Sequence, residues 1–211
     1  MTSVVRAAAT LAAVLVLAAC GSPDGPASGS EAAAGGADAS QCATVDVPML
    51  DIPTKADGDP VMAIPAPAGW ERKTEMDSEI IRFVLVNPSL AAENFAPNVV
   101  VTLESIAGDA SADEVFEQQR STLVSQGGAT DLKTTTGTLC GQPAETIDYV
   151  GAPVGATPSR PITLLLSALQ AGERTFAVAV TVQTLRPDDP TYVRDRDTIL
   201  EGFRFLPPDS A

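Results

Sequence analysis

The part of the chain after Cys42 is dominated by segments that alternate apolar and polar residues with the two-residue period of a β-strand. Besides the four clearest segments, which are given at the end of this paragraph, strands are expected at 61–64, 131–139 and 144–150. Because hairpin-length connections join many of these segments, the pattern predicts an antiparallel sheet. The four clearest segments carry their apolar residues at Ile81, Phe83 and Leu85; Val99, Val101 and Leu103; Ile162, Leu164, Leu166 and Ala168; and Phe176, Val178, Val180 and Val182.

Two stretches carry helical signals instead. Ser111 with Glu114 three residues later is a capping box, and Asp189 followed by Pro190 is an N-cap with proline at the first helical position. Gly202 predicts the end of the second helix. The order strands, helix, four strands, helix predicts an α+β fold in which both helices cover one face of the sheet.

The last long strand has one face made of small side chains, namely Thr175, Ala177, Ala179 and Thr181. Small residues let a helix pack close to a sheet, or they leave a groove for a ligand. We expect helix packing, because packing is the commoner use of such a face.

The first nineteen residues have the features of a bacterial export signal. Arg6 supplies a positive start, and residues 7–19 form an uncharged run that is too short to span a bilayer. The run ends in Leu17-Ala18-Ala19-Cys20, which matches the lipobox of bacterial lipoproteins. The sequence therefore predicts a signal peptide at 1–19 and acylation (palmitate) of Cys20. The alternative is a buried N-terminal helix followed by a chance cysteine.

Residues 20–41 are predicted to be the lipidated cysteine and a flexible tether. Seventeen of the residues 21–41 are Gly, Ala, Ser or Pro, a composition that cannot bury enough apolar surface to become ordered. Such a coil reaches roughly 25 Å. The remainder, 42–211, is predicted to be a single α+β domain.

Cys42 and Cys140 are the two cysteines that remain once Cys20 is assigned to acylation. Export places them in an oxidising compartment, so we expect a disulfide between them. It would close a loop of about 100 residues, for which chain entropy gives roughly 4–5 kcal/mol. The alternative is two buried free thiols, because spacing alone does not bring the two Cα atoms within bonding reach.

The absence of histidine and the net charge of −14 narrow the function classes. Without imidazole there is no Ser-His-Asp triad and no histidine metal ligand. The negative charge argues against nucleic acid as a partner, since basic contacts with phosphate supply most of that affinity. We expect no metal and no cofactor, and a binding or structural role in place of an enzymatic one.

Carboxylates are the remaining candidates for acid–base chemistry. The clusters are Asp57 with Asp59, Asp188 with Asp189, and Asp195 with Asp197. They fall in predicted loops or on a helix face beside Arg194 and Arg196, so we interpret them as solvated surface. The spaced ligands of a calcium-binding EF-hand are missing around Asp57.

Four features in order resemble the LpqN/LpqT lipoproteins of mycobacteria and their relatives. They are the lipobox, the polar tether, residues 64–70 (IPAPAGW) and residues 199–205 (ILEGFRF). The resemblance implies a fold similar to Mog1 and PsbP, with a curved antiparallel sheet and two flanking helices. It also implies an accessory role at the cell envelope, on the extracytoplasmic (periplasmic) face of the cell membrane, with contacts to trehalose glycolipids and RND-type lipid exporters. It transfers no catalytic motif.

Three functions follow as hypotheses. The first is a lipid-anchored protein that binds a glycolipid or acyl chain along an aliphatic sheet face and serves a transporter. The second is an adaptor that docks a protein through a strand edge or its acidic surface, and the third is a carboxylate-dependent hydrolase. No ligand-binding residue is assigned; Trp70, the single tryptophan, is expected to pack in the core, with a sugar platform as its alternative.

Overall fold

The computed structural model describes residues 39–208. The predicted signal peptide, Cys20 and most of the predicted tether lie outside these residues. The last three tether positions form a single 3-10 turn, η1 (Ala39–Gln41), directly before Cys42. No helix in the described part of the chain is long and apolar enough to cross a membrane.

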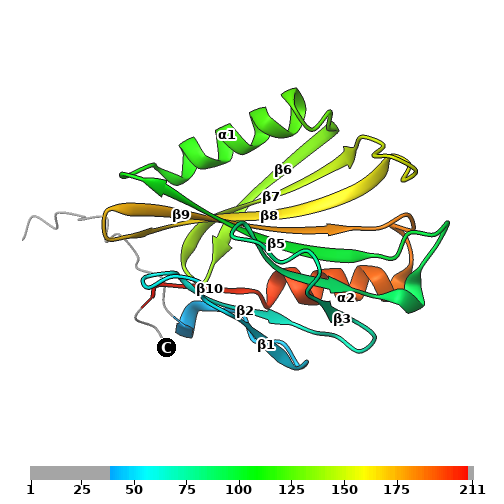
Figure 1. Cartoon of the computed structure of the whole chain (residues 1–211), viewed down its shortest axis with the longest axis horizontal. Helices are drawn as coiled ribbons and strands as arrows, with labels where there is room; N and C mark the ends of the chain where they lie inside the picture. Colours follow the sequence, from blue (N-terminus) through cyan, green and yellow to red (C-terminus); the bar gives the residue numbers. More distant parts are fainter. Residues whose placement is uncertain (1–38, 209–211) are drawn as a thin grey trace, which may run out of the picture. The chain divides into compact units, whose positions relative to one another are not determined.

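Seven strands form the larger sheet (Figure 1), with the spatial order β3-β4-β5-β9-β8-β7-β6 and antiparallel pairing throughout. This confirms the antiparallel sheet predicted from the alternating pattern. Its strands are β3 (Glu71–Lys73), β4 (Ile81–Val86), β5 (Asn98–Ala107), β6 (Thr130–Leu139), β7 (Gln142–Gly151), β8 (Arg160–Ala171) and β9 (Arg174–Gln183). A short 3-10 turn, η2 (Pro88–Leu90), lies in the β4–β5 connection.

A second, smaller sheet was not expected. It consists of β1 (Met49–Ile52), β2 (Val61–Pro65) and β10 (Arg204–Leu206), with β2 in the centre. The tail that the sequence predicts as extended pairs with β2, so that Phe205 lies opposite Met62. The local alternation of apolar residues carries no information about pairing between segments as distant as β2 and β10. The sequence therefore predicted one sheet and not two.

Both helices form where their caps predict. In α1 (Ala112–Ser125), the Ser111 hydroxyl accepts from the Glu114 N–H and the Glu114 carboxylate accepts from the Ser111 N–H. In α2 (Pro190–Glu201), the Asp189 carboxylate accepts from the N–H groups of Thr191 and Tyr192.

The prediction that the two helices share one face of the sheet is wrong. Val115 and Phe116 of α1 pack against Leu166 and Ala168 of β8. Ile199 of α2 belongs to the main core with Leu165 and Leu169, whose positions in β8 point to the opposite side. Figure 1 shows α1 and α2 on opposite sides of the seven-stranded sheet. Cap signals fix where a helix begins, but they carry no information about which face it covers.

The small-residue face of β9 packs under a helix, as expected. Ala177 and Ala179 are partly buried against the α1 cluster. The other face of the sheet is covered by α2 and the small sheet, and Val99, Val101 and Val180 are fully buried there.

In the structure a disulfide joins Cys42 to Cys140, with 4.0 Å between the two Cα atoms. Cys140 lies in the turn of the β6–β7 hairpin. The sequence placed this turn at Gly141-Gln142, but Cys140 and Gly141 are the turn residues, with φ of 48° and 82°. Two positive φ angles in succession are typical of a type I′ hairpin.

Candidate functional site

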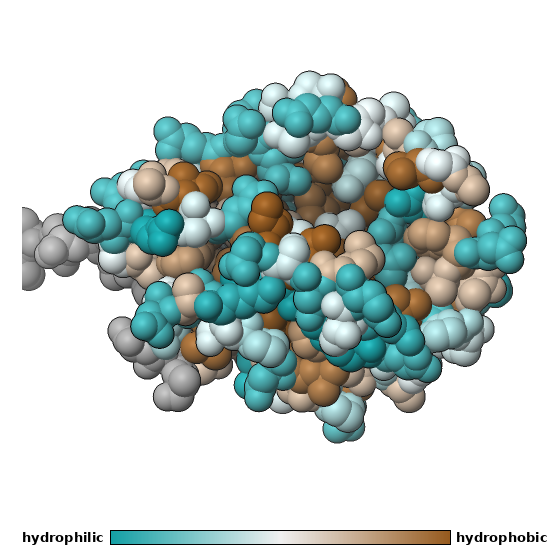
Figure 2. Space-filling model, in the orientation of Figure 1, coloured by the Kyte–Doolittle hydropathy of each residue, from teal (hydrophilic) through white to brown (hydrophobic). Residues whose placement is uncertain are grey.

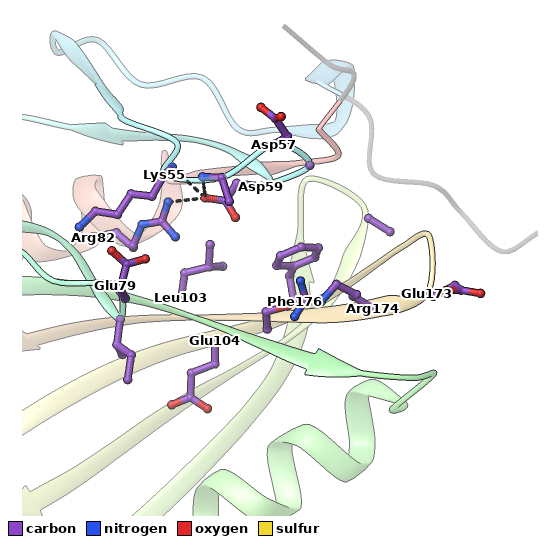
Figure 3. Close-up of a pocket in the computed structure, with 15 residues that line it drawn as sticks. Lys55, Asp57, Asp59, Glu79, Arg82, Leu103, Glu104, Glu173, Arg174 and Phe176 are labelled. Atoms are coloured by element: carbon purple, nitrogen blue, oxygen red, sulfur yellow. Dashed lines mark hydrogen bonds and ion pairs between the residues drawn. The ribbon is translucent and has the colours of Figure 1, made fainter.

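A pocket with a volume of about 810 Å³ lies at one end of the main core. Its walls come from the β1–β2 loop (55–59), the start of β4, the end of β5 and the β8–β9 hairpin (Figure 3). Leu103 and Phe176 are the apolar residues that the close-up labels beside it. The pocket therefore combines an apolar surface from the core edge with charged groups from two loops.

A buried ion pair forms one wall. The Arg82 Nη2 group donates to Asp59 Oδ2 over 2.5 Å, and the two side chains are 4% and 10% exposed. The backbone N–H groups of Lys55 and Ala56 also donate to this oxygen, over 2.9 and 3.1 Å. Arg82 thereby fixes the β1–β2 loop against β4.

The pKa of Asp59 is lowered by this arrangement. Burial alone raises the pKa of the carboxyl group, but the hydrogen bond from Arg82 and those from Lys55 and Ala56 outweigh burial and hold it below the ordinary value of 3.8. Asp59 is therefore a permanent acceptor at neutral pH and is unsuited to act as a general acid.

Arg82 uses only part of its hydrogen-bonding capacity. Nη2 also approaches the Pro53 carbonyl at 3.5 Å, whereas Nε is buried without a hydrogen-bond partner among residues 39–208. A buried donor without a partner is destabilising by about 1–3 kcal/mol.

Most other carboxylates around the pocket do not point into it. Figure 3 shows Asp57 and Glu173 directed outward and Glu104 directed to the far side of the sheet. Glu104 lies opposite Ala177 in the β5–β9 register, which places its side chain on the α1 face. The other charged residues that line the pocket are Arg82, Asp59, Lys55, Glu79 and Arg174.

The lowered pKa of Asp59 predicts a pH-dependent contribution to stability. The folded state binds the proton less tightly than the unfolded state, so the stabilisation is complete above pH 3.8 and is lost as pH falls through the lowered folded pKa. In urea unfolding, Asp59→Asn should be less stable than wild type at pH 7, and the gap should narrow below about pH 4. Asp57→Asn, an exposed change in the same loop, is the control and should show a small gap at every pH. A gap for Asp59→Asn that does not change with pH would contradict the assignment.

The other acidic clusters have structural partners. Asp189 caps α2 and pairs with Arg186, and Asp197 pairs with Arg196 on the exposed side of α2. The interpretation of Asp195 as solvated is wrong, because its residue is 1% exposed and Oδ2 accepts a 2.9 Å hydrogen bond from Trp70 Nε1. Trp70 itself is buried in the core, as expected.

A second pocket of about 630 Å³ lies beside the disulfide, between α2 and strands β6 to β8. Thr163, one of its lining residues, donates to Asp148 over 2.6 Å. No group of three or more Cys, Asp or Glu side chains is placed to hold a metal ion within the part of the chain that the structure describes. The first pocket is the stronger candidate, because it alone of the two contains the partly used arginine.

Sequence reasoning did not select Arg82. The signal was present as one arginine inside the apolar run Ile81–Val86. A charged residue within a buried strand is rarely left without a partner, so this position indicates a buried ion pair. Its partner Asp59 was named only as one of a surface pair.

The fold is of the α+β class, with a curved antiparallel sheet flanked by helices. Comparison with solved structures shows which known fold it resembles. The chain has an LpqN-like fold: the crystal structure of LpqN, which is involved in cell envelope biogenesis of Mycobacterium tuberculosis, aligns with a TM-score of 0.60 at 17% identity. The alignment covers 76% of this chain and 91% of LpqN. The Ran-binding protein Mog1p of Saccharomyces cerevisiae aligns at a TM-score of 0.43 and 11% identity, over 69% of this chain and 90% of Mog1p. No protein-family model and no curated protein matches the chain by sequence.

Proposed function

We propose that this protein is a lipid-anchored accessory of the cell envelope that binds the polar headgroup of a glycolipid in the Arg82 pocket. The observation that carries the proposal is the pocket itself, in which a partly used buried guanidinium lies beside the apolar side chains of Leu103 and Phe176. A few fixed polar groups beside an apolar surface are the usual make-up of a site for an amphipathic small molecule.

The headgroup, and not the acyl chain, is the part of the ligand that suits this pocket. The aliphatic sheet face, on which an acyl chain was expected, is filled by α2 and the small sheet, with Val99, Val101 and Val178 fully buried. An acyl chain there would have to displace core residues. The open pocket, with charged groups on its rim, offers hydrogen bonds to hydroxyl and ester oxygens instead.

An envelope location is supported by two independent features. The lipobox ending at Cys20 predicts export and acylation at the extracytoplasmic face of the membrane. The folded part is similar to LpqN, which acts in envelope biogenesis. An RND-type transporter would be the natural partner of a protein that hands over or collects a glycolipid, and this partnership is part of the proposal.

A role without catalysis is also part of the proposal. Asp59, Asp189 and Asp195 each accept hydrogen bonds that hold the fold together. The adaptor alternative is less well supported by the surface. On the face that Figure 2 shows, hydrophobic residues occur in separate spots between hydrophilic ones. Within residues 39–208 the exposed large apolar side chains come from three segments: Met76 and Ile80 from the β3–β4 loop, Val124 from α1 and Val154 from the β7–β8 connection.

Calorimetric binding tests the headgroup proposal. A short-chain trehalose monoester should bind, free trehalose should bind more weakly at the same pocket, and the free fatty acid alone should not bind. Arg174→Gln and Glu79→Gln, both at the rim, should each weaken binding of the ester about tenfold, since a hydrogen bond to a charged group contributes about 1.5–3 kcal/mol. Arg186→Gln, which lies before α2 and outside the pocket, is the matched control. Equal affinity of all three variants would place the ligand elsewhere.

The anchor has its own test. Cys20→Ala should prevent acylation and move the protein out of the membrane fraction, because at least two acyl chains are needed for stable attachment. A variant that fractionates like wild type would contradict the lipoprotein assignment.

A further inference from the structure

The two sheets present four edges within residues 39–208, and three of them are protected. The small sheet ends in β1 and β10, of four and three residues. One edge of the large sheet is β3, whose three residues Glu71, Arg72 and Lys73 are all charged. Short and charged edge strands discourage pairing with another chain. The fourth edge, β6, has ten residues, and its two charged residues, Asp131 and Lys133, lie within its first four positions.

Between Thr134 and Thr138 the free side of β6 lacks the usual protective features, which are confined to the start of the strand. The pairing with β7 is irregular between Thr130 and Lys133 and regular from Lys133 to Leu139. In this regular part Lys133 is the single charged residue, and the positions between Lys133 and Leu139 are all exposed. Thr134, Thr135, Thr136 and Thr138 are β-branched residues that favour strands. The stretch from Thr134 to Thr138 is regular, uncharged and exposed, and such an edge is a template for another strand.

We propose that β6 pairs with β6 of a second copy of this chain. The two strands run antiparallel about a two-fold axis at Thr136, the midpoint of the regular part, and the two large sheets become continuous. In this register Thr134 of each copy lies opposite Thr138 of the other, and Thr136 lies opposite Thr136. Facing threonines are favourable cross-strand pairs, and no like charges meet between positions 134 and 138. The same patch serves both copies, as a two-fold interface requires.

The position of the tether favours a second copy over an unrelated strand. The disulfide fixes Cys42, and with it the end of the tether, to Cys140, the residue directly after β6. Cys140 is four residues from Thr136, so each tether would begin about 13 Å from the two-fold axis. A tether reach of roughly 25 Å allows both acylated cysteines to lie in one membrane. This step rests on the proposed anchor, whereas the properties of the β6 edge do not.

The anchor also supplies the concentration that such an interface needs. One strand pair is a small interface, and small interfaces are weak in dilute solution. Confinement to a membrane raises the effective concentration without any new contact. Each mature copy carries a net charge of −15 once Arg6 is removed, so salt should strengthen the pairing by screening the repulsion.

Cross-linking on membranes tests the proposal. The full-length protein with Thr136→Cys is expressed, membranes are treated with a short bismaleimide, and dimer is scored on denaturing gels. The probe thiols of two copies meet at the axis, so most of the protein should cross-link, and more so at 300 mM than at 30 mM NaCl. Thr74→Cys, an exposed threonine next to the opposite edge of the sheet, is the control and should stay monomeric. Equal cross-linking of the two variants would overturn the pairing.

A charge test checks the register. Thr134→Lys and Thr138→Glu, each combined with Thr136→Cys, should cross-link more when the two proteins are co-expressed than when either is alone, because the new charges then face each other. No gain on co-expression overturns the register. The membrane fraction of each sample reports the anchor separately. If the protein is soluble, the anchor is contradicted; the cross-link is then measured in concentrated solution, where its absence overturns the pairing as well.

Discussion

Removal of the disulfide by Cys42→Ser with Cys140→Ser is expected to lower the free energy of unfolding by about 4 kcal/mol. The bridge spans a sequence separation of 98 residues, from the start of the described chain to the hairpin in its middle. A closed loop of this length restricts the unfolded chain strongly, and Cys140 is 3% exposed in the main core. Urea unfolding followed by tryptophan fluorescence measures the difference.

Two controls separate the cross-link from the substitutions themselves. Wild-type protein unfolded in the presence of a reductant should lose a similar amount of stability, because it keeps both sulfur atoms. The serine variant should not respond to the reductant. A loss below about 1 kcal/mol in both the variant and the reduced protein would show that the loop restricts the unfolded chain little.

The buried pair of Trp70 and Asp195 is expected to give the second large effect. Trp70→Ala should destabilise the domain by about 3–5 kcal/mol, since it empties a core position and leaves the Asp195 carboxylate without its indole donor. Trp70→Phe keeps an aromatic ring and removes only the N–H group, so a smaller loss of about 1–3 kcal/mol is expected.

A double-mutant cycle isolates the hydrogen bond. Asp195→Ala alone and Trp70→Phe alone should each destabilise, and the double variant should lose less than the sum of the two, because neither hydrogen-bonding group then remains without its partner. Asp197→Asn, an exposed change two residues away on α2, is the control. Strict additivity would mean that the two side chains do not interact.

The features of this fold that could be predicted from sequence are those with local causes. The capping box at Ser111 and the N-cap at Asp189 depend on residues within three positions, and both form as expected. Alternating apolar residues define β5 and β9 because each strand has one face on the main core, whereas β8 is buried on both faces and its predicted alternating set includes Leu166 and Ala168, which pack under α1.

The features that could not be predicted depend on partners far along the chain. Trp70 and Asp195 are 125 residues apart, and Arg82 and Asp59 are 23 apart. A one-dimensional pattern shows that Asp195 is near arginines on a helix, but not that it points into the core. The candidate pocket was missed for the same reason, since its walls come from four separate segments.

If the N-terminal segment anchors the domain to a membrane, as we propose, the disulfide has a mechanical consequence. Tension in the N-terminal segment passes through the sulfur atoms into the turn between β6 and β7 and bypasses the first strand of the small sheet. Without the bond the same pull would act at Met49 and peel the four residues of β1 from β2, one hydrogen-bonded pair after another. The disulfide thus determines where tension enters the folded domain, and a reducing environment would move that point from the β6–β7 turn to β1.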